Sequence, residues 1–76
     1  MDNKQYTVIL LFSISHAIKA ERLLDAAAIA CKLIPVPRQF SSQCGVCVRL
    51  FRQDQEQGLD TLNAGNLEIE GVYELC

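Results

Sequence analysis

Residues 6–12, Tyr-Thr-Val-Ile-Leu-Leu-Phe, constrain the fold more than any other segment of the chain. They are β-branched, aromatic or aliphatic at both alternating sets of positions. That pattern is typical of a strand whose two faces are both covered. The sequence therefore predicts a central strand here.

Two helices and three more strands are expected after it. The hydroxyls of Ser13 and Ser15 can cap a helix over residues 16–28, and Asp54 can cap a second helix that ends at Gly65. Gly58 weakens the second helix by about 1 kcal/mol relative to alanine. The expected strands cover residues 29–34, 46–51 and 67–75, and prolines 35 and 37 end the first of them.

This β-α-β-β-α-β order predicts one ferredoxin-like domain over residues 1–76, an α+β fold with a four-stranded antiparallel sheet and both helices on one face. The topology places the connection 35–44 and the start of the first helix at the same end of the sheet. Cys44 is then expected near Ser13, Ser15 and His16. Cys31 and Cys76 are expected at the other end.

The sheet face away from the helices is predicted to be apolar. If Val8, Leu10 and Phe12 face the helices, the opposite face carries Thr7, Ile9, Leu11, Cys47 and Phe51. An apolar patch of this kind normally marks a partner or homodimer surface.

Composition narrows the classes of function. Half of the residues are hydrophobic, yet no apolar run approaches the roughly 18 residues of a membrane span. The first residues lack a signal-peptide pattern, so we expect a cytoplasmic protein with reduced thiols, which are reactive, metal-binding or incidental.

The net charge is −2, so nucleic acid is not an expected ligand. The seven basic residues all lie within residues 1–52, which suits either an acidic partner or an ordinary solvated surface.

Cys44 is the leading candidate for chemistry. It lies in the loop segment Ser41-Ser42-Gln43-Cys44-Gly45, and a thiol near a helix N-terminus or a cation has a lowered pKa. Gly45 permits a positive φ and close approach of a partner. Ser41 and Ser42 can donate hydrogen bonds to a sulfur anion, and Arg38 supplies positive charge.

Cys47 completes a Cys-x-x-Cys spacing with Cys44. Three interpretations stay open for it: sheet packing, a resolving thiol, or a metal ligand. A zinc site needs two more ligands, and His16 is the only plausible one nearby. His16 is otherwise either a solvated helix-start residue or a group that binds an anion. We expect no metal site, and no catalytic triad or phosphate-binding loop is present.

Several segments together resemble a small bacterial family, the selenium/sulfur carrier protein-like proteins. They are Val8–Ser13 leading into His16–Leu24, Lys32-Leu33-Ile34-Pro35-Val36-Pro37-Arg38, Ser41-Ser42-Gln43-Cys44-Gly45 and Glu70-Gly71-Val72-Tyr73. The resemblance implies a carrier that holds sulfur or selenium on Cys44, requires no dissolved cofactor, and exchanges cargo with donor and acceptor proteins. Cys47 and Cys76 look like additions to the family pattern.

Two alternatives remain. One is a small binding or regulatory module that uses the open sheet face. The other is a soft-metal chaperone, although those proteins carry Cys-x-x-Cys after the first strand, where this chain has Ser13-Ile14-Ser15-His16.

Overall fold

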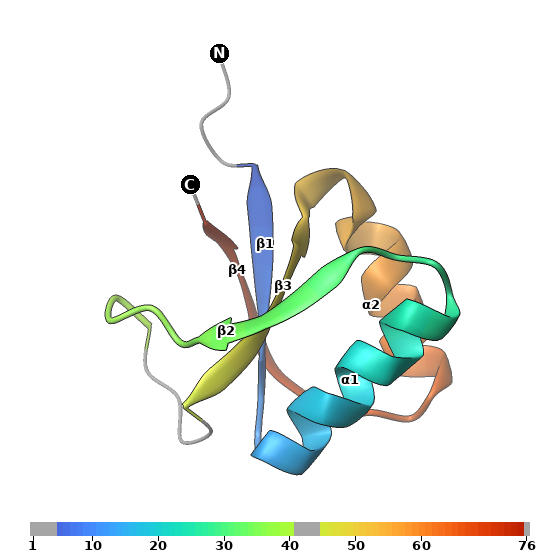
Figure 1. The fold of residues 1–76 in the computed structure, drawn as a ribbon, viewed down its shortest axis with the longest axis horizontal. Coiled ribbons are helices and arrows are strands. Elements are labelled where there is room, and N and C mark those ends of the chain that lie inside the picture. The colour runs from blue at the N-terminus through green and yellow to red at the C-terminus, as the bar shows by residue number, and fades with distance from the viewer. Residues whose placement is uncertain (1–4, 41–44, 76) are drawn as a thin grey trace.

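The computed structural model describes residues 5–40 and 45–75. Four strands, β1 (Tyr6–Leu11), β2 (Cys31–Pro35), β3 (Val46–Phe51) and β4 (Ile69–Leu75), form one antiparallel sheet in the order β2-β3-β1-β4. Helices α1 (Ile14–Ala26) and α2 (Gln55–Ala64) lie on one side of it, and a short 3-10 turn, η1 (Arg52–Asp54), precedes α2 (Figure 1). The predicted ferredoxin-like α+β fold is confirmed, with β1 in the interior of the sheet.

Both helices end in a Schellman motif. After α1, Ala28 adopts a left-handed backbone with φ +61°, and the Ile29 N–H donates to the Leu24 carbonyl at 2.9 Å. After α2, Asn66 has φ +58° and the Leu67 N–H donates to the Leu62 carbonyl at 3.1 Å. These bonds satisfy carbonyls that the helix ends leave without partners. The predicted helix 16–28 was therefore too long at its C-terminus, because Ala28 is a good helix former placed in the terminating position.

The main core lies between the sheet and the helices. Ile9 and Leu11 of β1 point into it, and the other buried members are Ala17, Ala20, Leu24, Ile29, Val48, Leu50, Leu62 and Leu67. Thr7 is fully buried on the same side, and its hydroxyl donates to Oε1 of Gln55 at 2.8 Å. The buried hydroxyl of Thr7 is thus satisfied by a hydrogen bond to α2.

The predicted assignment of β1 side chains to the two faces was wrong. Val8 and Leu10 face away from the helices, whereas Thr7, Ile9 and Leu11 face toward them. The pattern of β1 does not fix this choice, because both alternating sets are apolar and a shift of one residue exchanges the faces. Cys47 lies on the outer face, as expected, but its neighbours there are Val8 and Leu10. Phe12 lies beyond the end of β1 and is half-exposed.

The chain itself covers part of the outer face. Val36, Phe40 and Ile34 pack against Val8, Leu10 and Cys47. Figure 1 shows the connection after β2 on the side of the sheet away from the helices. This cover removes the main reason for expecting a homodimer through the face, since the most apolar part of it is already buried. A homodimer stays an untested prediction.

Candidate functional site

The candidate site lies at the end of the sheet where β2 stops and β3 starts. Pro35 pairs with Val46, and the Val36 N–H donates to the Gly45 carbonyl at 3.1 Å. This bond joins the two ends of the connection. Gly45 has φ +82°, and a Cβ built on it would meet no heavy atom within 4 Å. The positive φ, and not a lack of space for a side chain, therefore favours glycine at position 45.

Three of the predicted site residues, Ser41, Ser42 and Cys44, lie outside the described residues. The described framework on either side of them is formed by Arg38, Phe40 and Gly45. Arg38 is exposed in a turn that the Phe40 N–H closes by donating to the Pro37 carbonyl at 3.0 Å.

Phe40 holds residues 35–40, the first part of the connection, against the sheet. Its ring stacks on that of Tyr73 in β4, with 4.7 Å between centroids and 23° between planes. It also packs against the cluster that contains Val8, Leu10 and Cys47. This anchor was not predicted. The only signal was the pair of apolar residues Val36 and Phe40 in an otherwise polar loop, and no spacing rule predicts where such residues pack.

The N-terminus of α1 lies at the same end of the sheet as Gly45, as the topology predicted (Figure 1). Ser13 caps the helix, and its Oγ accepts from the His16 N–H at 3.2 Å. The same oxygen lies 2.7 Å from Nδ1 of His16. His16 is therefore oriented by its own cap residue, and the residue is exposed. Within residues 5–40 and 45–75, no hydrogen bond or ion pair joins His16 to Arg38 or Gly45.

Cys47 is fully buried beneath the connection. A reactive thiol must be reached by its partner, and a buried thiol in apolar surroundings is inert. This placement supports sheet packing among the three interpretations of Cys47. Within the described part of the chain, no group of three His, Cys, Asp or Glu side chains is arranged to hold a metal ion.

Cys31 lies at the far end of the sheet, opposite Leu50. Its thiol donates to the Glu21 carbonyl at 3.8 Å. Burial raises the pKa of the Cys31 thiol, and the nearby carboxylates of Glu21 and Asp25 raise it further. Less thiolate is then present at neutral pH, so Cys31 is a poor nucleophile.

Comparison with known proteins identifies a family. The model of the family described as "Putative Se/S carrier protein-like" matches residues 6–74. No curated protein and no solved structure shows significant similarity to the chain. Neither helix of the described residues is long and apolar enough to cross a membrane.

Proposed function

The chain belongs to the Se/S carrier protein-like family, and from this membership we propose that it carries sulfur or selenium on Cys44. The observation that carries the proposal is the extent of the family match, which spans residues 6–74 and so includes the whole connection between β2 and β3. Membership supports a carrier role that involves donor and acceptor proteins in general. Cys44 as the carrier thiol is our assignment.

The two described cysteines support this assignment by elimination. Cys47 is fully buried, and the pKa of Cys31 is raised by burial. Cys76 follows the strand end opposite the connection, since β4 pairs Leu75 with Tyr6. Cys44 is the cysteine that adjoins Gly45, at which an added Cβ would meet no heavy atom within 4 Å.

The proposed chemistry is a transfer between thiols without net oxidation. The Cys44 thiolate attacks the terminal sulfur of a donor persulfide, R–S–SH. The new S–S bond gives Cys44–S–SH, and the broken S–S bond leaves its electron pair on the donor as R–S⁻, which takes up the proton lost by Cys44. A thiolate on the acceptor then attacks the terminal sulfur and releases the Cys44 thiolate. Selenium follows the same route as the terminal atom.

The surrounding residues have supporting roles in this proposal. Gly45 gives access to the sulfur, and the hydroxyls of Ser41 and Ser42 donate hydrogen bonds to its anion. Arg38 contributes positive charge, which favours the thiolate. His16 offers a further hydrogen bond from the end of α1.

Mass spectrometry of the intact protein after incubation with a cysteine desulfurase and cysteine tests the assignment. We expect a gain of one sulfur atom that maps to Cys44 in the wild type and is lost in Cys44→Ser. Cys76→Ser is the matched control, because it also removes one thiol, and it should load normally. Full loading of Cys44→Ser would overturn the carrier role of this residue.

Alkylation at neutral pH with peptide mapping provides an independent test. Cys44 should label before Cys31 and Cys47 in the folded protein. Faster labelling of Cys31 would show that the reactive thiol lies at the other end of the sheet.

A further inference from the structure

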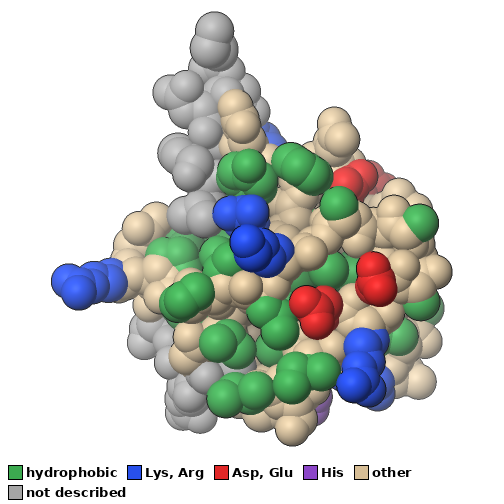
Figure 2. All heavy atoms as spheres, viewed as in Figure 1, with side chains coloured by type: hydrophobic (Ala, Val, Ile, Leu, Met, Phe, Trp, Pro, Cys, Tyr) green, Lys and Arg blue, Asp and Glu red, His purple; other side chains and the backbone are tan. Residues whose placement is uncertain are grey.

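The connection leaves half of the outer sheet face uncovered, and this half carries both aromatic and basic side chains. Tyr6 lies two residues before Val8 on β1, while Arg49 and Phe51 follow Cys47 on β3 at the same alternation. Lys32 lies two residues before Ile34 on β2. Figure 2 shows basic and hydrophobic side chains side by side on the face that carries β2, with acidic side chains nearer the helices.

Lys32 and Arg49 are direct neighbours across two strands. Like charges placed opposite each other in a sheet repel and destabilise it. No carboxylate of residues 5–40 or 45–75 forms an ion pair with either side chain, and no described group accepts a hydrogen bond from them. Two positively charged residues thus lie side by side on neighbouring strands of a chain whose net charge is −2.

The guanidinium of Arg49 is already oriented. Its Cζ lies 4.4 Å from the centroid of the Tyr6 ring, over the ring face. Such stacking holds the guanidinium while its N–H groups stay available at the edge, and this edge matches the paired oxygens of a phosphate or carboxylate. The arrangement suits recognition of an oxyanion by Arg49, with Lys32 as a second charge.

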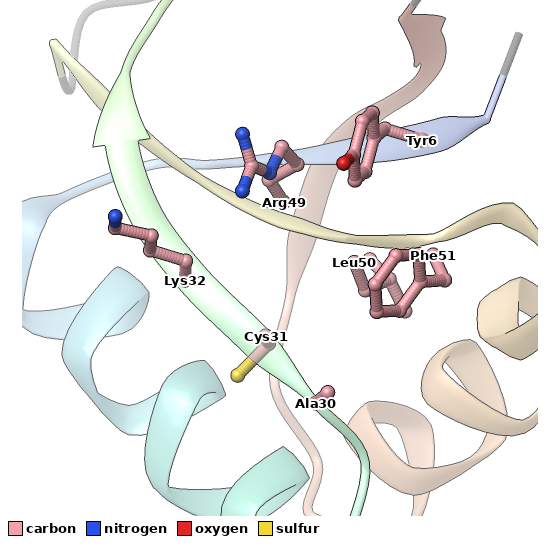
Figure 3. A pocket seen from close by; sticks show the side chains of 7 residues that line it. All are labelled: Tyr6, Ala30, Cys31, Lys32, Arg49, Leu50 and Phe51. Carbon is pink, nitrogen blue, oxygen red and sulfur yellow. The ribbon is translucent and has the colours of Figure 1, made fainter.

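A hollow of about 130 Å³ adjoins these cations. Tyr6, Lys32, Arg49 and Phe51 line it, together with Ala30, Cys31 and Leu50 (Figure 3). The rings of Tyr6 and Phe51 stack with 5.5 Å between centroids, and Phe51 remains 44% exposed. The hollow therefore offers flat aromatic surface beside two positive charges.

We propose that this hollow binds a small phosphorylated ligand with a planar ring, of which a mononucleotide is the simplest representative. The phosphate accepts hydrogen bonds from Arg49 and Lys32, and the ring lies against Phe51. A nucleic-acid strand is the less suitable source of this chemistry, because strands bind along a track of cations with one contact per phosphate, whereas two cations line this hollow. The proposal does not depend on the carrier role of Cys44.

Titration of the isotope-labelled protein with AMP, followed by amide NMR at low salt, tests the proposal. We expect saturable shifts centred on residues 6, 30–32 and 49–51. Inorganic phosphate alone and adenosine alone should each bind at least about tenfold more weakly, since each supplies one half of the recognition. Raising the salt to about 0.2 M should weaken AMP binding, because exposed charges are screened.

Variants connect the shifts to the two cations. Arg49→Gln and Lys32→Gln should each weaken AMP binding at least about tenfold. Arg49→Lys keeps the charge but loses the planar donors, and should be impaired nearly as much as Arg49→Gln. Lys19→Gln is the matched control, because it removes one exposed positive charge on α1, and it should bind like the wild type. The dispersed amide spectrum of each variant reports that it is folded.

Three results would overturn the proposal. The first is no saturable shift at millimolar AMP. The second is an equal loss of affinity in Lys19→Gln and Arg49→Gln, which would indicate a general charge effect. The third is an oligonucleotide that binds far more tightly than AMP at the same residues, which would identify a strand as the ligand.

Discussion

The rings of Phe40 and Tyr73 stack 4.7 Å apart, although 33 positions separate them in the sequence. Phe40 comes from the connection after β2 and Tyr73 from β4, the strand at the other edge of the sheet. The connection therefore reaches across the outer face. This contact fixes the segment immediately before the proposed carrier loop.

Replacing this ring should weaken both the fold and the cover over Cys47. Phe40→Ala removes a partly buried ring from the outer cluster, and we expect a loss of about 2 kcal/mol in the free energy of unfolding. Alkylation of Cys47 in the native protein should become faster. Urea unfolding and peptide mapping measure the two effects. Phe12→Ala is the control, because that ring is half-exposed and lies outside both hydrophobic clusters. Equal effects of the two substitutions would contradict the anchoring role of Phe40.

Ala28→Gly should stabilise the protein. An alanine in the left-handed region carries a backbone cost of about 1–2 kcal/mol, and glycine adopts that region freely at the expense of greater chain entropy when unfolded. With φ +61° at Ala28, we expect a net gain of about 0.5–1 kcal/mol. Thermal unfolding measures it. Ala30→Gly, just before β2, should be destabilising instead, so a gain at both sites would show that the backbone argument is incorrect.

Gly58→Ala should destabilise the protein even though alanine favours a helix. A Cβ at this position would lie 2.7 Å from Cδ1 of Leu50 and 3.5 Å from Cδ2 of Leu24. Both leucines are buried, so the methyl group forces the core to shift at a typical cost of about 1–3 kcal/mol. That cost exceeds the helical gain of about 1 kcal/mol. Chemical denaturation checks the sign, and Asn63→Ala on the exposed side of α2 should be neutral or slightly stabilising.

Gly58 also illustrates what the sequence could and could not predict. Local patterns gave the six elements and their order, because strand alternation, proline stops and helix caps are short-range signals. From such signals Gly58 was expected only to weaken the helix, whereas in the structure its lack of a side chain allows α2 to approach β3 and α1. Close approach is a tertiary property, and a single glycine in a helical pattern does not report it.

The two faces of β1 show the same limit. Apolar residues at every position predict burial of β1 but not which set meets the helices. For the candidate site, the topology predicted at which end of the sheet the connection between β2 and β3 lies. The cover that Val36 and Phe40 provide did not, because loop packing has no periodic signal. The Lys32 and Arg49 pair was also missed, since residues 17 apart become neighbours only when the strand register is known.

The corrected orientation of β1 makes a direct prediction about Ile9. Its side chain is fully buried against the helices, so Ile9→Ala should cost about 2–5 kcal/mol. Ile14→Ala is the matched control, because Ile14 is 56% exposed and its truncation should change stability by less than about 0.5 kcal/mol. Urea unfolding compares the pair. A small loss of stability in Ile9→Ala would indicate that Ile9 faces the outer side of the sheet.

Stability at alkaline pH should depend on Cys31. Burial, followed by the carboxylates of Glu21 and Asp25, raises the pKa of its thiol above the ordinary value of 9.0 in the folded protein. Below that value both folded and unfolded chains keep the proton, so the thiol adds no pH dependence. Above it the unfolded chain loses the proton first, which lowers the free energy of unfolding as the pH rises toward the folded pKa.

The Cys31→Ala variant lacks this group, so the stability of the variant should fall less than that of the wild type above about pH 9. Cys76→Ala serves as the control for the loss of a thiol at the chain end. Parallel stability curves for wild type and Cys31→Ala across the alkaline range would show that the Cys31 thiol titrates normally.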